Sequence, residues 1–138
     1  MIRFLILLLL STQLFANPYD FKVLRIIDGD TVEFQADFLP KPLKPKMSIR
    51  VLGVDTPEKG HRAKCDVEAE AAKKASAFTT QKINNAKKVE ILIKKHDKYG
   101  GRLLGDVIID GDKLSELLIE NGHGIEYHGG KKENPWCD

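Results

Sequence analysis

Four short polar segments of the sequence carry side chains that could act together on a phosphodiester bond. They are residues 28–31 (Asp-Gly-Asp-Thr), Arg50, residues 55–58 (Asp-Thr-Pro-Glu) and residues 97–102 (Asp-Lys-Tyr-Gly-Gly-Arg). Cleaving such a bond requires an activated water molecule and stabilisation of the negative charge that develops on the phosphate oxygens. Each segment alone is a weak signal, since Asp-Gly-Asp is a common turn that recurs at residues 110–112. Together they supply the acids and the arginines that this chemistry needs.

The acids and the arginines would serve different parts of the reaction. Asp30 and Asp55 offer hard oxygen ligands, which suit calcium better than a soft metal. Glu58 lies three residues beyond Asp55, close enough to orient or deprotonate a water molecule near such an ion. Arg50 and Arg102 carry planar guanidinium groups that can bind two phosphate oxygens at once. The residues therefore predict a calcium-assisted site with carboxylates on the metal side and arginines on the phosphate side.

Alternating and helical apolar patterns predict the elements that position these segments. Along the third predicted strand, Arg50 should face away from Ile49 and Val51, because side chains alternate between the two faces. The Thr-Pro pair at residues 56–57 should end that part of the sheet. We expect strands at residues 21–27, 31–34, 47–52, 89–93 and 103–109, and helices at residues 66–88 and 113–121.

The order of these elements predicts the fold class. Three strands, a helix, two strands and a second helix indicate an α+β, mainly β protein. Five strands with a helix inserted after the third are typical of a small Greek-key barrel of the OB-fold type. We therefore expect a five-stranded OB-fold barrel with two helices.

The first sixteen residues have the pattern of a secretory signal peptide. Arg3 supplies a positive start, residues 4–10 are apolar, and residues 11–16 are smaller and more polar. The apolar run is too short for a permanent membrane anchor, although an uncleaved anchor is the alternative. Cleavage after Ala16 would leave one domain at residues 17–138, exported to the periplasm or secreted. The formal charge would fall from +2 to +1, since only Arg3 is charged there, so phosphate recognition must be local.

Two cysteines, Cys65 and Cys137, remain in that domain. An even number of cysteines in an exported protein favours a disulfide, which would tether the tail beside Cys65, and two free thiols are the alternative. We also expect Trp136 to pack on the barrel and to help the disulfide hold the tail in place. The four histidines lack the spacing of a zinc site.

In this order and spacing, the polar segments resemble the staphylococcal-nuclease-like (thermonuclease) family. The similarity extends from about Val23 to Tyr127 and includes residues 75–79 (Ala-Ser-Ala-Phe-Thr) and residues 85–90 (Asn-Ala-Lys-Lys-Val-Glu). The resemblance implies an OB-fold barrel with a calcium-dependent endonuclease site. It also implies DNA and RNA as substrates, single-stranded or denatured by preference, and products with 3′-phosphate ends.

The resemblance assigns roles to individual residues. It implies a calcium site formed by Asp30, Asp55 and the backbone carbonyl of Thr56. It implies a catalytic group formed by Arg50, Glu58 and Arg102, in which the arginines bind the scissile phosphate and the glutamate acts as general base.

Substrate contacts follow from the same resemblance. Lys98 and Tyr99 match residues that contact a terminal phosphate of the substrate. Tyr127 is the candidate for a second aromatic contact, and His128 occupies the alternative alignment. We expect the protein to act as a monomer.

The sequence departs from the family pattern at three places. The loop between Phe34 and Met47 is longer and carries three lysines and three prolines, so it either touches backbone phosphates away from the cleavage point or is simply solvated. An additional glycine precedes Arg102, in the Gly-Gly pair at residues 100–101. After Tyr127 the third helix of the family is missing.

Two other functions are compatible with parts of the pattern. A non-catalytic OB-fold module would bind nucleic acid through basic and aromatic side chains, but two unneutralised aspartates would repel a phosphate. A calcium-binding structural domain would account for the acids and would leave Arg50 and Arg102 without a role. Catalysis is the function that uses all five polar positions.

Overall fold

Two β-sheets and two helices make up the part of the chain that the structure, a computed structural model, describes, which is residues 17–137. The predicted signal peptide at residues 1–16 lies outside this part. The main sheet has the order β1-β2-β3-β6-β5, with β7 attached to β6, and a second sheet pairs β4 with β8. The elements are β1 (Val23–Asp28), β2 (Thr31–Gln35), β3 (Lys46–Val51), β4 (Gly53–Asp55), a 3-10 turn η1 (Gly60–Arg62), α1 (Asp66–Asn84), β5 (Val89–His96), β6 (Arg102–Ile109), β7 (Asp112–Lys113), α2 (Leu114–Glu120) and β8 (Ile125–Tyr127).

This arrangement confirms the predicted α+β, mainly β class with two helices. All neighbouring strands are antiparallel except β3 and β6, which are parallel. The sheet does not close into a barrel through a continuous ladder of described residues. A single bridge between Tyr19 and Ile91 joins the segment before β1 to β5. The fold is therefore OB-like, and this one bridge is what joins the two edges of the main sheet within the described residues. Three short strands, β4, β7 and β8, are present in addition to the five predicted ones.

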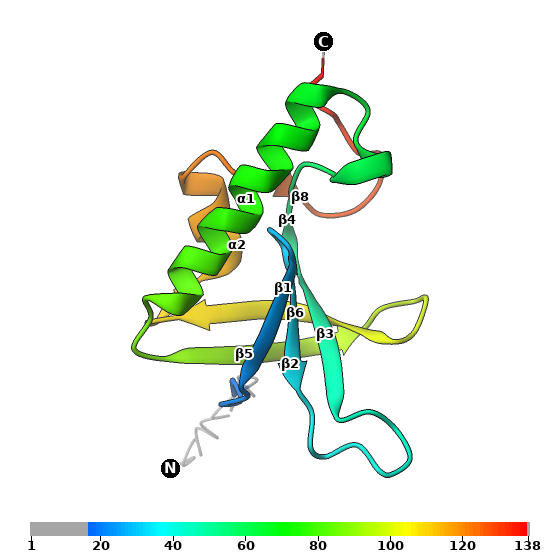
Figure 1. The fold of residues 1–138 in the computed structure, drawn as a ribbon, viewed down its shortest axis with the longest axis vertical. Coiled ribbons are helices and arrows are strands. Elements are labelled where there is room, and N and C mark those ends of the chain that lie inside the picture. Colours follow the sequence, from blue (N-terminus) through cyan, green and yellow to red (C-terminus); the bar gives the residue numbers. More distant parts are fainter. Residues whose placement is uncertain (1–16, 138) are drawn as a thin grey trace, which may run out of the picture.

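The hydrophobic core lies between the bent sheet and the helices. Val32 and Phe34 of β2 and Ile49 and Val51 of β3 are fully buried, whereas Arg50 faces the opposite side of the sheet, as predicted. Helix α1 crosses the sheet on the β1 side, with α2 beside it (Figure 1). In the part of the chain from residue 17 to 137, neither helix combines the length and the hydrophobicity that a membrane span requires.

Helix α1 also fixes the turn between β1 and β2. The Thr79 hydroxyl donates a 2.7 Å hydrogen bond to the carbonyl of Gly29, which lies between Asp28 and Asp30. A Cβ atom at Gly29 would lie 2.8 Å from the Cβ of Ala75, so only glycine allows the helix to approach this closely. The Asp-Gly-Asp segment is thus held against α1 by both packing and a buried hydrogen bond.

Helix α1 ends at Asn84, four residues before the predicted end at residue 88. The Asp110 carboxylate, in the turn after β6, accepts hydrogen bonds from the backbone N–H groups of Lys87 and Lys88, both at 2.9 Å. These N–H groups therefore leave the helical pattern and lead the chain into β5. Ala86, which continues the helical period beyond Asn84, packs against the core from irregular backbone.

The tail after β8 is fastened to the start of α1. Cys65 and Cys137 form a disulfide with a Cα–Cα distance of 6.0 Å, which confirms the predicted pairing. Residues 128–137 contain no helix. Trp136 differs from expectation: it lines a shallow pocket with Val67 of α1 and His123 after α2, and so lies on the helices instead of the barrel strands.

Candidate active site

A cavity of about 250 Å³ opens where the β1–β2 turn, β3, the loop after β4 and the start of β6 meet. Its lining is strongly charged and combines acids with bases. The predicted site residues along its wall are Asp30, Arg50, Thr56, Glu58 and Arg102, and the other lining residues are Asp28, Thr31, Pro57, Arg62 and Lys132. Segments that are far apart in the sequence therefore meet at one polar cavity.

The parallel pairing of β3 with β6 brings the two predicted phosphate-binding arginines to one face. Arg50 lies opposite Leu104, and Arg102 precedes Leu104 by two residues, so both arginines share a face of the sheet. The additional glycine is absorbed in the turn before β6, where Gly100 and Gly101 adopt φ angles of 71° and 68°. Arg102 therefore begins the strand and reaches the cavity despite the insertion.

Arg102 is oriented by an acid in the same turn. Its Nε donates to Oδ2 of Asp97 at 2.8 Å, and its Nη2 donates to the same oxygen. These hydrogen bonds lower the pKa of the Asp97 carboxyl below its ordinary range. Asp97 thus remains charged and holds the guanidinium group in a fixed direction.

Arg50 holds the two predicted metal-binding carboxylates together. Its Nε lies 3.5 Å from Oδ2 of Asp30, and its Nη2 lies 3.3 Å from Oδ1 of Asp55. Both aspartates are almost completely buried, with 6% and 4% of their surface exposed. Thr56, the third predicted ligand, follows Asp55 directly and is equally buried. The three residues form a compact set of hard oxygen atoms beside the arginine.

The chemistry of this set fits a divalent cation. Burial raises the pKa of Asp30, and Arg50 and the 2.9 Å hydrogen bond from Thr31 offset this effect only in part. A buried carboxylate with a raised pKa lacks sufficient positive charge around it, which a further cation would supply. Oxygen-only ligands are those that calcium prefers.

Glu58 lies at the mouth of the cavity between two basic side chains. Its Oε2 is 3.3 Å from Nε of Arg62, and its Oε1 is 3.5 Å from Nζ of Lys132. About a third of the Glu58 side chain is exposed, so water can reach it. Its position fits a group that accepts a proton from a water molecule in the cavity.

Lys132 is a site residue that the sequence analysis missed. Its Nζ lies 2.8 Å from Oδ1 of Asp55, and it lies 5.8 Å from the centre of the Tyr127 ring. Although burial acts to lower it, the hydrogen bond and the charge of Asp55 hold the pKa of Lys132 above its ordinary value. Nothing in the local sequence marks this lysine, because Gly-Gly-Lys-Lys at residues 129–132 reads as a solvated tail.

Glu68 is a second missed residue, and it organises the site from outside the cavity. Its carboxylate is buried, with 3% exposed, and accepts hydrogen bonds from three segments. The donors are the backbone N–H of Glu58 at 3.1 Å, the backbone N–H of Lys64 at 2.7 Å and the side-chain amide of Asn134 at 3.1 Å. Burial alone would raise the pKa of Glu68, but these three hydrogen bonds hold it below its ordinary value.

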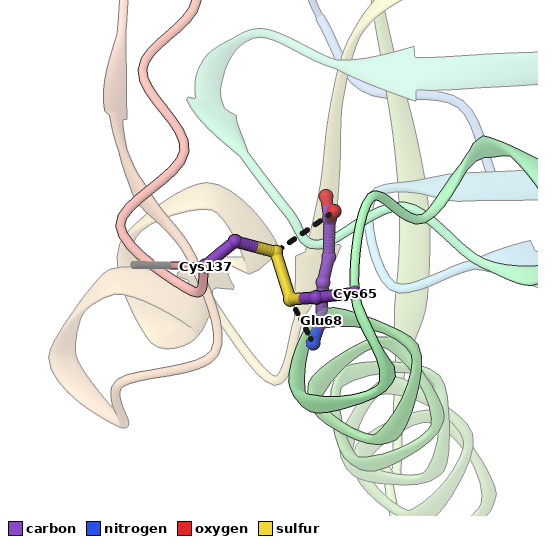
Figure 2. Close-up of side chains that lie close together, drawn as sticks. All are labelled: Cys65, Glu68 and Cys137. Carbon is purple, nitrogen blue, oxygen red and sulfur yellow. Dashed lines mark hydrogen bonds between the residues drawn. A yellow bond between two sulfur atoms is a disulfide. The ribbon is translucent and has the colours of Figure 1, made fainter.

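Figure 2 shows Glu68 directly beside the Cys65–Cys137 disulfide. The Glu68 N–H donates to Sγ of Cys65 at 3.4 Å, which caps the start of α1. This Cys-x-x-Glu pattern is related to a capping box, a signal from which Glu68 could have been found. The two sulfurs and the carboxylate lie within 4.8 Å of one another, but the sulfurs are bonded to each other and offer no thiolate to a metal.

The predicted substrate-contacting residues do not line the cavity wall. Lys98 and Tyr99 lie in the turn before Arg102, where Lys98 Nζ is 5.0 Å from the Tyr99 ring centre and Tyr99 is 83% exposed. Tyr127 ends β8, and its hydroxyl donates to the carbonyl of Gly130 at 2.9 Å. His128, the alternative, pairs with Glu126 on the exposed surface at 2.9 Å.

The basic loop between β2 and β3 lies away from this cavity. None of its residues contributes to the wall, and Figure 1 shows it at the end of the molecule opposite the helices. Lys46, at the start of β3, pairs with Glu33 of β2 at 3.2 Å. The loop therefore takes no part in the cavity wall, and its contact with backbone phosphates away from the cleavage point stays a prediction.

Comparisons with known proteins show which family the chain resembles. Residues 48–135 match the family described as Staphylococcal nuclease homologue. The thermonuclease of Staphylococcus hyicus is 33% identical over 109 residues, which are 78% of this chain and 59% of that relative. The matched part therefore spans less than two thirds of the relative's length. The family match includes Arg50, Glu58 and Arg102, and Asp30 lies before it.

Proposed function

The chain belongs to the staphylococcal nuclease family, and we propose that it is an exported, calcium-dependent endonuclease that hydrolyses DNA and RNA. The observation that carries the proposal is one charged cavity lined by two arginines from neighbouring strands and by the carboxylates that face them. Such a cavity combines phosphate recognition with water activation, and phosphodiester hydrolysis requires both.

The arginines bind the scissile phosphate. Arg50 is oriented by Asp30 and Asp55, and Arg102 is oriented by Asp97, so each guanidinium group is held in place before substrate arrives. Hydrogen bonds from guanidinium groups strengthen as negative charge develops on the phosphate oxygens. Preorganised donors of this kind lower the barrier because they need no rearrangement during the reaction.

Asp30, Asp55 and the Thr56 carbonyl would hold Ca²⁺, which would supply positive charge beside the phosphate. Two carboxylates are few for a calcium site, so we expect a dissociation constant of about 10⁻⁴ to 10⁻³ M. This range suits an enzyme that works outside the cytoplasm, where calcium is abundant, and keeps the enzyme inactive before export. A calorimetric affinity below the micromolar range without substrate would contradict this expectation.

Glu58 acts as the general base and accepts the proton of the attacking water. The water oxygen forms a bond to phosphorus as the bond from phosphorus to the 5′ oxygen breaks, and the released 5′ oxygen takes up a proton from water. The phosphate therefore remains on the 3′ oxygen of the product. Tyr127, which lies beside Lys132, and the Lys98–Tyr99 turn, which precedes Arg102, contact the nucleotide and its terminal phosphate. Single-stranded or denatured nucleic acid fits best, because exposed bases can stack on the aromatic side chains.

The proposal includes export and a monomeric state. Residues 1–16 would be removed, and the domain at residues 17–138 would act in the periplasm or outside the cell. The main alternative is an OB-fold module that binds nucleic acid without cutting it. The buried carboxylate of Asp30 argues against this alternative, because Arg50 offsets the cost of its burial only in part and an acid beside a phosphate is unfavourable unless a further cation joins them.

The test is the release of acid-soluble fragments from heat-denatured DNA and from RNA. The mature protein is assayed with calcium, with magnesium and with a calcium chelator, and the ends of the products are analysed. We expect fragments with 3′-phosphate ends in calcium and none with the chelator. A folded, processed protein that binds DNA in calcium but releases no fragments would support the binding module instead.

A further inference from the structure

We propose that Lys132 is a tethered cation that competes with the divalent metal for Asp55, and that the Cys65–Cys137 disulfide keeps it in place. The inference deepens the proposed function and rests on it, because it concerns the same calcium site. It assigns a role to a lysine of the tail that lies far from the other site residues in the sequence.

The contact that carries the inference is direct. Lys132 Nζ lies 2.8 Å from Oδ1 of Asp55, and Arg50 Nη2 lies 3.3 Å from the same oxygen. Asp55 is nearly buried, so these two cations provide its neutralisation. Calcium binds carboxylate oxygens at about 2.3–2.6 Å. A calcium ion on Asp55 and an ammonium group on the same oxygen would repel each other at close range, so tight binding of one opposes the other.

The tail holds Lys132 over Asp55 from both sides. On the N-terminal side, the Tyr127 hydroxyl donates to the carbonyl of Gly130. On the C-terminal side, the Asn134 side chain donates to Glu68 at 3.1 Å and accepts the backbone N–H of Cys137 at 3.2 Å. Lys132 thus lies in a short segment anchored at both ends. Such anchoring gives the ammonium group a high effective concentration at Asp55.

The disulfide is the covalent part of this anchor. It joins Cys137, five residues beyond Lys132, to the start of α1 beside Glu68. Without it, the position of Asn134 would depend on the hydrogen bonds alone, and the tail could separate from α1. Loss of the disulfide should therefore weaken the hold of Lys132 on Asp55 and favour the metal.

The test compares Lys132→Met with Lys131→Met. Lys131 is the neighbouring, exposed lysine, so the two variants have the same net charge. Calcium binding is measured by calorimetry without nucleic acid, and melting temperature is measured with and without calcium. We expect the calcium dissociation constant to fall about tenfold in Lys132→Met and to stay unchanged in Lys131→Met. Calcium should also raise the melting temperature more in Lys132→Met than in the wild type.

The outcomes separate this inference from the proposed calcium site. Equal or weaker calcium binding in Lys132→Met, with a wild type that binds calcium, would overturn the competition and leave the site intact. Absence of calcium binding in all three proteins would overturn both. The melting curves report whether each variant is folded.

A second comparison tests the tether. In Cys65→Ser/Cys137→Ser, calcium should bind more tightly than in the wild type, and adding Lys132→Met should then have a smaller effect. A full tenfold effect of Lys132→Met in the protein without the disulfide would show that the disulfide does not hold the lysine.

Discussion

The backbone N–H of Glu58 donates a 3.1 Å hydrogen bond to the buried carboxylate of Glu68. The same carboxylate binds the side chain of Asn134, two residues beyond Lys132. The proposed general base and the tail lysine are therefore positioned by one acid on the first turn of α1. Glu68 itself does not line the cavity, so its influence on the reaction acts through these two segments.

The first prediction concerns Glu68 and pH. Although burial acts to raise its pKa, hydrogen bonds from Lys64, Glu58 and Asn134 hold the pKa of folded Glu68 below the ordinary value of 4.5. The unfolded chain therefore binds this proton more readily than the folded chain does. Glu68 stabilises the fold above pH 4.5, and this stabilisation is lost as the pH falls through the lowered folded value.

Urea denaturation at a series of pH values measures this effect. We expect the free energy of unfolding of Glu68→Gln to be lower than that of the wild type at neutral pH and to fall less steeply below about pH 4.5. Glu120→Gln, on the exposed surface of α2, is the control. Parallel curves for the wild type and Glu68→Gln would show that Glu68 does not carry this linkage.

The second prediction concerns Arg50→Lys. A lysine keeps the positive charge but cannot bridge Asp30 and Asp55 while it binds a phosphate in a bidentate way. We expect the rate of fragment release to fall by about 10²- to 10⁴-fold with little loss of folding. Arg25→Lys, on the exposed surface of β1, should keep its activity. Full activity in Arg50→Lys would refute the bidentate role.

The third prediction concerns Glu58→Gln. The substitution removes the carboxylate but keeps the backbone N–H that binds Glu68. We expect a rate loss of about 10²- to 10⁴-fold, because the amide cannot accept a proton from water. Calcium affinity, measured by calorimetry, should be largely retained, since Asp30 and Asp55 remain. A variant that cleaves DNA at the wild-type rate would assign proton transfer to another group.

The fourth prediction concerns the disulfide. Cys65 and Cys137 are separated by 72 positions, and closing a loop of this length in the unfolded chain is worth about 4 kcal/mol in the chain-entropy model. We expect Cys65→Ser/Cys137→Ser to lose about 2–4 kcal/mol of unfolding free energy in urea. The reduced wild type should behave similarly. Coincident transitions for the oxidised and reduced proteins would contradict the prediction.

The strands that the sequence predicts are those with a local period. Alternation along β3 places Arg50 opposite to Ile49 and Val51, because burial of one face leaves a repeat of two in the sequence. The short strands β4 and β8 leave no such repeat. They form a sheet by pairing with each other, Gly53 opposite Tyr127, although they are far apart in the sequence. Such a pairing is evident only in the folded chain.

The site residues also divide into those that the sequence predicts and those that become evident only in the folded chain. Acids and arginines with a recognisable chemistry can be selected from the sequence, and the structure brings Arg50 and Arg102 to one cavity. Lys132 could not be selected, because its position depends on a disulfide and on the hydrogen bonds of the tail. The early end of α1 also depends on a contact between distant residues. The Asp110 carboxylate accepts hydrogen bonds from backbone N–H groups that lie more than twenty residues earlier in the sequence.

The parallel pairing of β3 with β6 has a consequence for the protein during its synthesis. Arg50 lies opposite Leu104, so 104 − 50 = 54 residues must be added before the pair can form. At about 5–20 residues per second, this takes about 3–10 seconds. During that interval the growing polypeptide has Arg50 but no Arg102 beside it. The nascent chain therefore has only one of the two cavity arginines in place while it is still attached to a ribosome and its messenger RNA.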